Sequence, residues 1–188
     1  MTRQPGRKER LDADVAVVGY GPVGMVVAAL LGRRGHRVVA LERYPGLYNL
    51  PRAGVFDDET MRTFAALGIV EELSPKLKAA QRYRFVNGAG EVLMEFDWAA
   101  IGRSGWAESY GFYQPDLEDA LDNVCRGLPN VDVRHSVRVT GLAPNSSSVA
   151  LIVSGPEGST QTITAGYVVA CDGGNSFVRQ HLGIEQHD

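Results

Sequence analysis

The residues best suited to chemistry in this chain are three glycines with the spacing Gly-x-Gly-x-x-Gly, at positions 19, 21 and 24. Between a strand and a helix, Gly19 allows a tight turn, Gly21 lets the backbone approach a pyrophosphate, and Gly24 lets helix and strand pack closely. A helix is expected over about residues 23–34, and helix N-termini attract anions. The spacing therefore predicts a dinucleotide-binding turn formed by Gly19, Gly21, Pro22, Val23 and Gly24.

Two short apolar runs flank this turn and helix. Residues 15–18 are rich in valine, as expected of a central parallel strand that is buried on both faces. Residues 37–41 predict a second strand, which leads into Glu42. The Glu42 carboxylate is placed to accept hydrogen bonds from a ribose, although a solvated acid at a strand end gives the same pattern. Arg43 could hold a 2′-phosphate, but the carboxylate beside it disfavours one and favours FAD or NAD over NADP.

The same apolar region also has a competing interpretation. Residues 15–32 carry no charge and follow a basic leader, which is a feature of signal peptides and membrane spans. The glycines and Pro22 fit a turn better than a continuous apolar helix, and Asp12 and Asp14 interrupt the junction. We therefore predict no membrane association and a disordered basic leader over residues 1–12, whose cations are Arg3, Arg7, Lys8 and Arg10.

Size and composition limit the remaining possibilities. The chain has 188 residues, a formal net charge of −3 and 44% hydrophobic residues. This length and hydrophobic content are enough to bury a core, in one domain or in one and a half domains. A nearly neutral charge gives no electrostatic reason to expect nucleic acid as a partner. Cys125 and Cys171 lie far apart, which favours a reduced, cytoplasmic protein. The four histidines have no metal-ligand spacing, so we expect no metal site.

The rest of the chain predicts a mixture of helices and hairpins. After a loop over residues 43–56, a helix begins near Asp57 or Asp58, either of which suits an N-cap, and Gly68 ends it. Residues 82–86 and 91–96 predict a hairpin, and Pro115 opens a helix that runs to about Arg126. Further strands are expected at residues 110–114, 131–134, 137–142, 149–153, 161–164 and 167–171, the last as a buried run, before a final helix at 175–182.

This order of elements predicts an α/β protein that is not a plain doubly wound domain. A simple dehydrogenase alternates strands and helices more regularly. We therefore expect a Rossmann-like βαβ dinucleotide-binding domain over residues 13–188, with inserted antiparallel segments around 81–114 and 131–165. FAD is long and its isoalloxazine needs a second wall, which the inserted segments could provide.

Four segments together point to one family. The first is the glycine turn with Glu42-Arg43. The others are Pro51-Arg52-Ala53-Gly54-Val55 with Asp57-Asp58-Glu59-Thr60-Met61-Arg62, Phe112-Tyr113-Gln114-Pro115-Asp116-Leu117-Glu118, and Ala170-Cys171-Asp172-Gly173-Gly174-Asn175-Ser176-Phe177-Val178-Arg179. With these segments the chain resembles the FAD-dependent aromatic hydroxylases, the single-component flavoprotein monooxygenases of the p-hydroxybenzoate hydroxylase fold. Within that family it is most similar to 3-(3-hydroxyphenyl)propionate hydroxylases.

The resemblance implies cofactor-binding roles for five further residues. Arg52 would lie near the flavin, although a surface salt bridge is the simpler alternative. Gln114 would contact the cofactor, or merely satisfy backbone groups. Asp172 and Gly173 would hold FAD and help the nicotinamide donor, while Asp172 could also cap the final helix. Arg179 would serve the same neighbourhood, or pair with a carboxylate.

The resemblance also implies a reaction. NAD(P)H would supply electrons to FAD, and one oxygen atom of O₂ would be transferred to a phenolic aromatic substrate. No residue is assigned as the base that activates the phenol. Two alternatives remain open: an FAD-binding module without turnover, and an NAD-dependent dehydrogenase, which the Asp172-Gly173-Gly174 segment disfavours. Flavin-dependent halogenases and reductases of the same fold are further possibilities.

One motif of the family is missing. The family carries a later Gly-Asp motif that binds the ribityl and pyrophosphate groups, and this sequence contains no Gly-Asp dipeptide. We therefore expect the chain to be the N-terminal part of a longer enzyme and to be inactive alone.

Overall fold

The structure is a computed structural model that describes residues 11–48 and 50–187. These residues form two compact units, one made of Met1–Leu47 and Cys125–Asp188 and the other of Tyr48–Val124, within the described ranges. The first ten residues of the predicted leader lie outside the described residues. Its last two, Leu11 and Asp12, hydrogen-bond to Arg37 and Thr164. The single domain over residues 13–188 stays a prediction.

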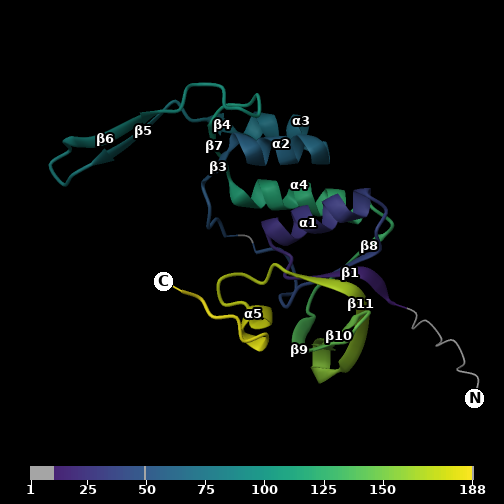
Figure 1. The fold of residues 1–188 in the computed structure, drawn as a ribbon. Coiled ribbons are helices and arrows are strands. Elements are labelled where there is room, and N and C mark those ends of the chain that lie inside the picture. Colours follow the sequence, from purple (N-terminus) through teal and green to yellow (C-terminus); the bar gives the residue numbers. More distant parts are fainter. Residues whose placement is uncertain (1–10, 49, 188) are drawn as a thin grey trace, which may run out of the picture. The chain divides into compact units, whose positions relative to one another are not determined.

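The first unit is built on a six-stranded sheet with the strand order β8-β2-β1-β11-β10-β9 (Figure 1). The parallel half consists of β1 (Ala13–Val18), β2 (Val38–Leu41), β8 (Val131–Arg134) and β11 (Thr160–Ala170). The antiparallel half joins β11 to β10 (Val149–Ser154) and β9 (Arg138–Pro144). This is the predicted βαβ unit with antiparallel strands added, so the predicted fold class is confirmed for this unit.

Local sequence explains the parallel half. Strands β1 and β2 are almost entirely buried, as their runs of valine and alanine predict. Helix α1 (Pro22–Arg33) packs on β1, β2 and β8, and its buried residues are small or flexible ones. The core continues into the antiparallel half through Val139, Leu151, Val153 and Ile163, and α5 (Phe177–His181) adds Val178.

Strand β11 corrects one prediction. Residues 161–164 and 167–171 were expected as two strands, but residues 161–170 all belong to a single strand of eleven residues, which ends at Ala170. The strand is continuous because Ala165 pairs with Ala13 of β1 on one side and with Val149 of β10 on the other. The expectation that its second half is buried is also wrong, since Tyr167 is 74% exposed.

The second unit contains a small sheet with the order β3-β7-β4 and three helices. Its strands are β3 (Val55–Asp57), β4 (Lys78–Ala79) and β7 (Ser109–Gly111), and its helices are α2 (Asp58–Leu67), α3 (Val70–Leu73) and α4 (Gln114–Arg126), of which the last two residues belong to the first unit. A short 3₁₀ turn, η1 (Ser74–Lys76), follows α3, and another, η2 (Pro156–Gly158), precedes β11 in the first unit.

Helix α2 begins and ends where the sequence predicts. Asp57 is its N-cap and accepts a hydrogen bond from the Thr60 N–H at 2.9 Å, while Gly68 ends it with a φ of 72°. Strand β3 occupies the end of what was predicted to be a loop. It is held there by the Phe56 ring, whose centroid lies 5.2 Å from that of Phe64 and 5.1 Å from that of Phe112.

The predicted hairpin is confirmed as β5 (Arg82–Val86) and β6 (Val92–Asp97). It extends away from α2 and α3 of its own unit (Figure 1). One face carries a row of aromatic rings, Tyr83, Phe85, Phe96 and Trp98. The other face carries Arg82 and Arg84, which both form ion pairs with Glu95.

Candidate cofactor-binding site

Three parallel strands bring their carboxyl ends to one edge of the first unit's sheet. Strands β1, β2 and β11 are followed by Gly19, Glu42 and Cys171, respectively. The backbone ties these ends together, because the Gly19 N–H donates to the Leu41 carbonyl at 2.8 Å and the Cys171 N–H donates to the Val18 carbonyl at 2.7 Å. In open α/β sheets, ligands bind outside the carboxyl ends of the strands, so this edge is the candidate site.

Two glycines of the turn are required by packing. Gly19 has a φ of +93°, and a Cβ there would lie 2.4 Å from the Cys171 carbonyl oxygen and 2.9 Å from the Cα of Asp172. A Cβ on Gly24 would lie 2.0 Å from the carbonyl oxygen of Gly19. The turn, helix α1 and the start of the Asp172 segment are therefore in backbone contact, and these positions admit no side chain.

Gly21 differs, because a Cβ there would meet no atom within 4 Å. It is the N-cap of α1, makes no side-chain capping hydrogen bond, and is followed by Pro22 at the first helical position. The first turn of α1 contains no acidic residue. The first N–H groups of a helix lack partners inside the helix and carry partial positive charge, so this open position fits a pyrophosphate.

Glu42 is more than a solvated acid at a strand end. Its Oε2 accepts a hydrogen bond from the Tyr20 N–H at 2.9 Å, and its Oε1 accepts one from the Tyr44 N–H at 3.0 Å. A carboxylate has about four lone-pair sites, so two remain for ribose hydroxyls. Arg43 is exposed and its guanidinium lies over the Tyr44 ring, 4.9 Å from the centroid.

The Asp172 segment is fastened to the start of α5. Asp172 accepts hydrogen bonds from the Ser176 hydroxyl at 2.5 Å and from the Val178 N–H at 3.1 Å. Ser176, rather than Asp172, is the N-cap, and its hydroxyl accepts from the Arg179 N–H. Asp172 therefore does not cap the helix itself but binds the hydroxyl of the residue that does, so the capping alternative is correct in part. Gly173 is exposed and has a φ of 84°, and a Cβ there would meet nothing within 4 Å.

Arg179 binds backbone carbonyls of its own segment. Its guanidinium donates to the Gly174 carbonyl at 3.3 Å and to the Ile184 carbonyl at 3.4 Å. The partners of Arg179 are therefore backbone carbonyls and not the carboxylate that the alternative expected.

The other two predicted residues, Arg52 and Gln114, lie together in the second unit. Gln114 was expected at the end of a strand, but it forms the first turn of α4, and β7 ends at Gly111. The prediction was wrong because the pairing of β7 with β3 and β4 extends only as far as Gly111. The Gln114 Oε1 accepts hydrogen bonds from the N–H groups of Arg52 and Ala53, at 2.8 and 2.9 Å.

Sequence reasoning missed several residues at the sheet edge. The Tyr20 ring packs edge-on against the His135 ring, with 5.7 Å between centroids. Ser136 has a φ of 58°, which is uncommon for a residue other than glycine, and its N–H donates to the Tyr44 carbonyl at 2.9 Å. His135 and Ser136 follow β8, the parallel strand at the edge of the sheet, and the rule that ligands bind at carboxyl ends of strands could have found them.

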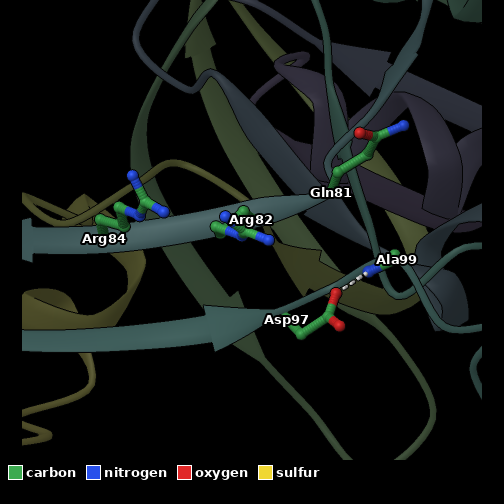
Figure 2. A pocket seen from close by; sticks show the side chains of 5 residues that line it. All are labelled: Gln81, Arg82, Arg84, Asp97 and Ala99. Carbon is green, nitrogen blue, oxygen red and sulfur yellow. Dashed lines mark hydrogen bonds between the residues drawn. The ribbon is translucent and has the colours of Figure 1, made fainter.

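A separate hollow lies on the second unit, at the base of the β5–β6 hairpin (Figure 2). It measures about 570 Å³ and is lined by Gln81, Arg82, Arg84, Asp97 and Ala99. Figure 2 shows the Asp97 carboxylate accepting the Ala99 N–H, and both arginines are paired with Glu95. The hollow contains no predicted site residue, and its charges are largely compensated.

Two searches concern other kinds of site. Over residues 11–48 and 50–187, no helix has the length and hydropathy needed to cross a membrane. In the same part of the chain, no three or more His, Cys, Asp or Glu side chains form a group that could hold a metal ion.

Comparison with known proteins identifies the family. The family model described as FAD binding domain matches residues 12–188. The chain belongs to this FAD-binding domain family. FAD is therefore the cofactor of this family, and the predicted resemblance is confirmed.

Relatives of this FAD-binding domain include named aromatic hydroxylases. A probable NADH-specific resorcinol 4-hydroxylase of Rhodococcus jostii (strain RHA1) is 47% identical over 98% of this chain and 35% of its own length. A 3-(3-hydroxy-phenyl)propionate/3-hydroxycinnamic acid hydroxylase of Paraburkholderia xenovorans (strain LB400) is 35% identical over 95% of this chain and 28% of its own length. The predicted kinship with the second class is confirmed, although the resorcinol hydroxylase shares the higher identity.

Solved structures agree with this assignment. A p-nitrophenol 4-monooxygenase from Pseudomonas putida DLL-E4 superposes with a TM-score of 0.83 and 30% identity, over 90% of this chain and 43% of that protein. Aklavinone-11 hydroxylase, solved in a ternary complex with FAD and aklavinone, gives a TM-score of 0.75 and 26% identity, over 93% of this chain and 35% of that protein. The FAD-binding domain spans about a third of the length of its curated relatives.

Proposed function

We propose that this chain is the FAD-binding part of a monooxygenase that hydroxylates a phenolic aromatic compound with NAD(P)H and O₂. The observation that carries the proposal is the open Gly21 position at the start of α1, beside the Glu42 carboxylate, in a member of the FAD-binding domain family. Two relatives are named as hydroxylases of resorcinol and of hydroxyphenylpropionate, which are both phenols. The relative named NADH-specific favours NADH as the electron donor.

Each site residue receives a role in this proposal. The backbone at Gly21, Pro22, Val23 and Gly24 binds the pyrophosphate, with Gly19 shaping the turn. The Glu42 carboxylate accepts hydrogen bonds from the adenosine ribose, and the exposed Arg43 flanks it. Asp172, Gly173 and Arg179 are proposed to line the site beside the turn at the same sheet edge, since the backbone of Asp172 lies against Gly19.

Arg52 and Gln114 are proposed to serve the flavin end of the cofactor. Bound FAD supplies the redox chemistry, and the protein contributes binding, orientation and exclusion of water. No described residue is proposed as the base that activates the phenol. A cytoplasmic location is proposed from the two free cysteines, Cys125 and Cys171, which suit a reducing compartment.

Two alternatives carry distinct expectations. An FAD-binding module without turnover would bind FAD but would not oxidise NADH when a phenol is added, even within a longer protein. An NAD-dependent dehydrogenase would bind NAD in place of FAD, and membership of the FAD-binding domain family disfavours it.

The test is a titration of the purified chain with FAD, followed by flavin fluorescence and absorbance, with NAD in a parallel titration. We expect saturable FAD binding that is weakened in Glu42→Ala. Glu91→Ala is the matched control, because Glu91 is an exposed glutamate in the β5–β6 turn, where it accepts a hydrogen bond from Asn87. Saturable NAD binding without FAD binding would overturn the proposal and favour the dehydrogenase.

A further inference from the structure

The side-chain amide of Gln114 is held at both ends. Its oxygen accepts hydrogen bonds from the backbone N–H groups of Arg52 and Ala53, at 2.8 and 2.9 Å. Its nitrogen donates to Oε1 of Glu118, one helical turn further along α4, at 2.7 Å. An amide has one accepting end and one donating end, so the Glu118 acceptor determines which end faces Arg52 and Ala53.

Because Gln114 and Glu118 are buried, only one orientation of the Gln114 amide satisfies all of these hydrogen-bonding groups. Gln114 is 3% exposed and Glu118 is 2% exposed, so bulk water offers little competition for either group. If the amide turned over, its NH₂ group would face two N–H donors, and no hydrogen bond could form. Without the Glu118 acceptor, the buried NH₂ group would lose its partner, which is costly in a site that excludes water.

Among residues 11–48 and 50–187, the segment held by Gln114 makes few other hydrogen bonds. Residues 51–54 form no helix or strand and are exposed. Gly54 accepts a hydrogen bond from the Phe112 N–H at 3.1 Å, and the Arg52 guanidinium lies over the Tyr48 ring, 4.5 Å from its centroid. Gln114 therefore provides the contact that fixes the main chain at Arg52 and Ala53, next to the proposed flavin-binding side chain.

We propose that Glu118 is a positioning residue for the cofactor site: it orients the Gln114 amide, which in turn clamps the backbone of Arg52 and Ala53. The clamp is a property of the second unit, whereas its effect on FAD rests on the proposed function. Glu118 itself is not proposed to touch the cofactor, because its carboxylate is buried and is engaged by Gln114.

The direct test is backbone amide hydrogen exchange, measured by NMR on the full chain without FAD. Glu118→Met has a similar length but cannot accept the hydrogen bond, whereas Glu118→Gln keeps an acceptor oxygen. We expect the Arg52 and Ala53 amides to exchange about tenfold faster in Glu118→Met and at nearly the wild-type rate in Glu118→Gln. The Thr60 amide, which Asp57 holds in the same unit, reports whether the unit remains folded.

The outcomes of these measurements can be told apart. Unchanged exchange at Arg52 and Ala53 in Glu118→Met, with Thr60 still protected, would overturn the clamp. If Thr60 loses protection, the unit has unfolded in Glu118→Met, and the variant no longer tests the clamp. The wild-type chain then decides, because the clamp requires slow exchange of the Gln114 side-chain NH₂ protons. Fast exchange of these protons would refute it. We also expect FAD affinity to fall about tenfold in Glu118→Met and to recover in Glu118→Gln. Failure of the wild-type chain to bind FAD would sink the proposed function but leave the exchange test intact.

Discussion

Replacing Gly21 with alanine should separate cofactor binding from folding. Gly21 has a φ of −80° and a ψ of −175°, an extended conformation that alanine adopts without strain, and the added Cβ would meet nothing within 4 Å. Alanine lowers the entropy of the unfolded chain, which stabilises by about 0.4–1 kcal/mol, but it is a poorer N-cap than glycine by a similar amount. The free energy of unfolding should therefore stay within about 1 kcal/mol of the wild type.

The same methyl group should weaken FAD binding strongly. If the pyrophosphate lies against the turn, the methyl group occupies its space, and overpacking of this kind costs about 1–3 kcal/mol. That cost raises the Kd for FAD by about 5-fold to 150-fold. Urea denaturation followed by circular dichroism measures the stability, and a flavin fluorescence titration measures the Kd.

Gly24→Ala is the matched control, since its Cβ would lie 2.0 Å from the Gly19 carbonyl oxygen. It should lose stability by about 1–3 kcal/mol or more before any effect on binding is considered. An FAD affinity in Gly21→Ala equal to that of the wild type would refute the assignment of this position to the pyrophosphate. A loss of stability in Gly21→Ala as large as in Gly24→Ala would refute the conclusion that the space beside Gly21 is free to hold a side chain.

Three further predictions concern stability and are measured by urea denaturation. Asp57→Ala removes the cap of α2 and should cost about 1 kcal/mol, while Asp57→Ser keeps most of it. Hydrogen bonds from Thr60 hold the pKa of Asp57 below its usual value. The cap's contribution is therefore present above about pH 4 and is lost as pH falls through the lowered pKa; an equal effect of Asp57→Ala at pH 7 and at pH 2 would contradict this. Burial raises the pKa of Glu118, against the hydrogen bond from Gln114 and the charge of Arg52. Because the folded state then binds the proton more tightly, wild-type stability should fall as pH rises from about 4.5 towards the raised pKa, and Glu118→Gln should remove that fall. Leu151→Ala empties a fully buried position in β10 and should cost about 2–5 kcal/mol, whereas Ile152→Ala, 41% exposed beside it, should cost less; equal losses would contradict the assigned faces of the strand.

The first βαβ unit could be predicted because its signals are local. Valine-rich strands, the glycine spacing and the acid after the second strand lie within about thirty residues of each other, and each restricts the backbone directly. The caps of α2 were predicted for the same reason, since an aspartate and a glycine act on the residues next to them.

Predictions failed where distant segments decide the outcome. Strand β11 is continuous because Ala165 pairs with both β1 and β10, and nothing near Ala165 in the sequence signals those partners. Gln114 was placed in a strand because the aromatic residues before it favour extended structure, whereas β7 pairs only as far as Gly111. The hydrogen bond from Gln114 to Glu118 has a helical spacing that the sequence shows, whereas nothing in the sequence indicates that Gln114 also accepts hydrogen bonds from the distant Arg52 and Ala53.

The sequence by itself predicted a dinucleotide-binding glycine turn and a ribose-binding carboxylate at position 42, because these depend on residue types at short, fixed spacings, and the resemblance to a family added FAD. Only the tertiary structure decided that Gly19 must remain without a side chain to admit Cys171 and Asp172, and that Glu42 fastens the turn through Tyr20. The contact between Gly19 and Asp172 joins residues that are 153 positions apart in the sequence. Its formation depends on which strands pair in the sheet, and that choice is made by the packing of the whole core rather than by any local preference.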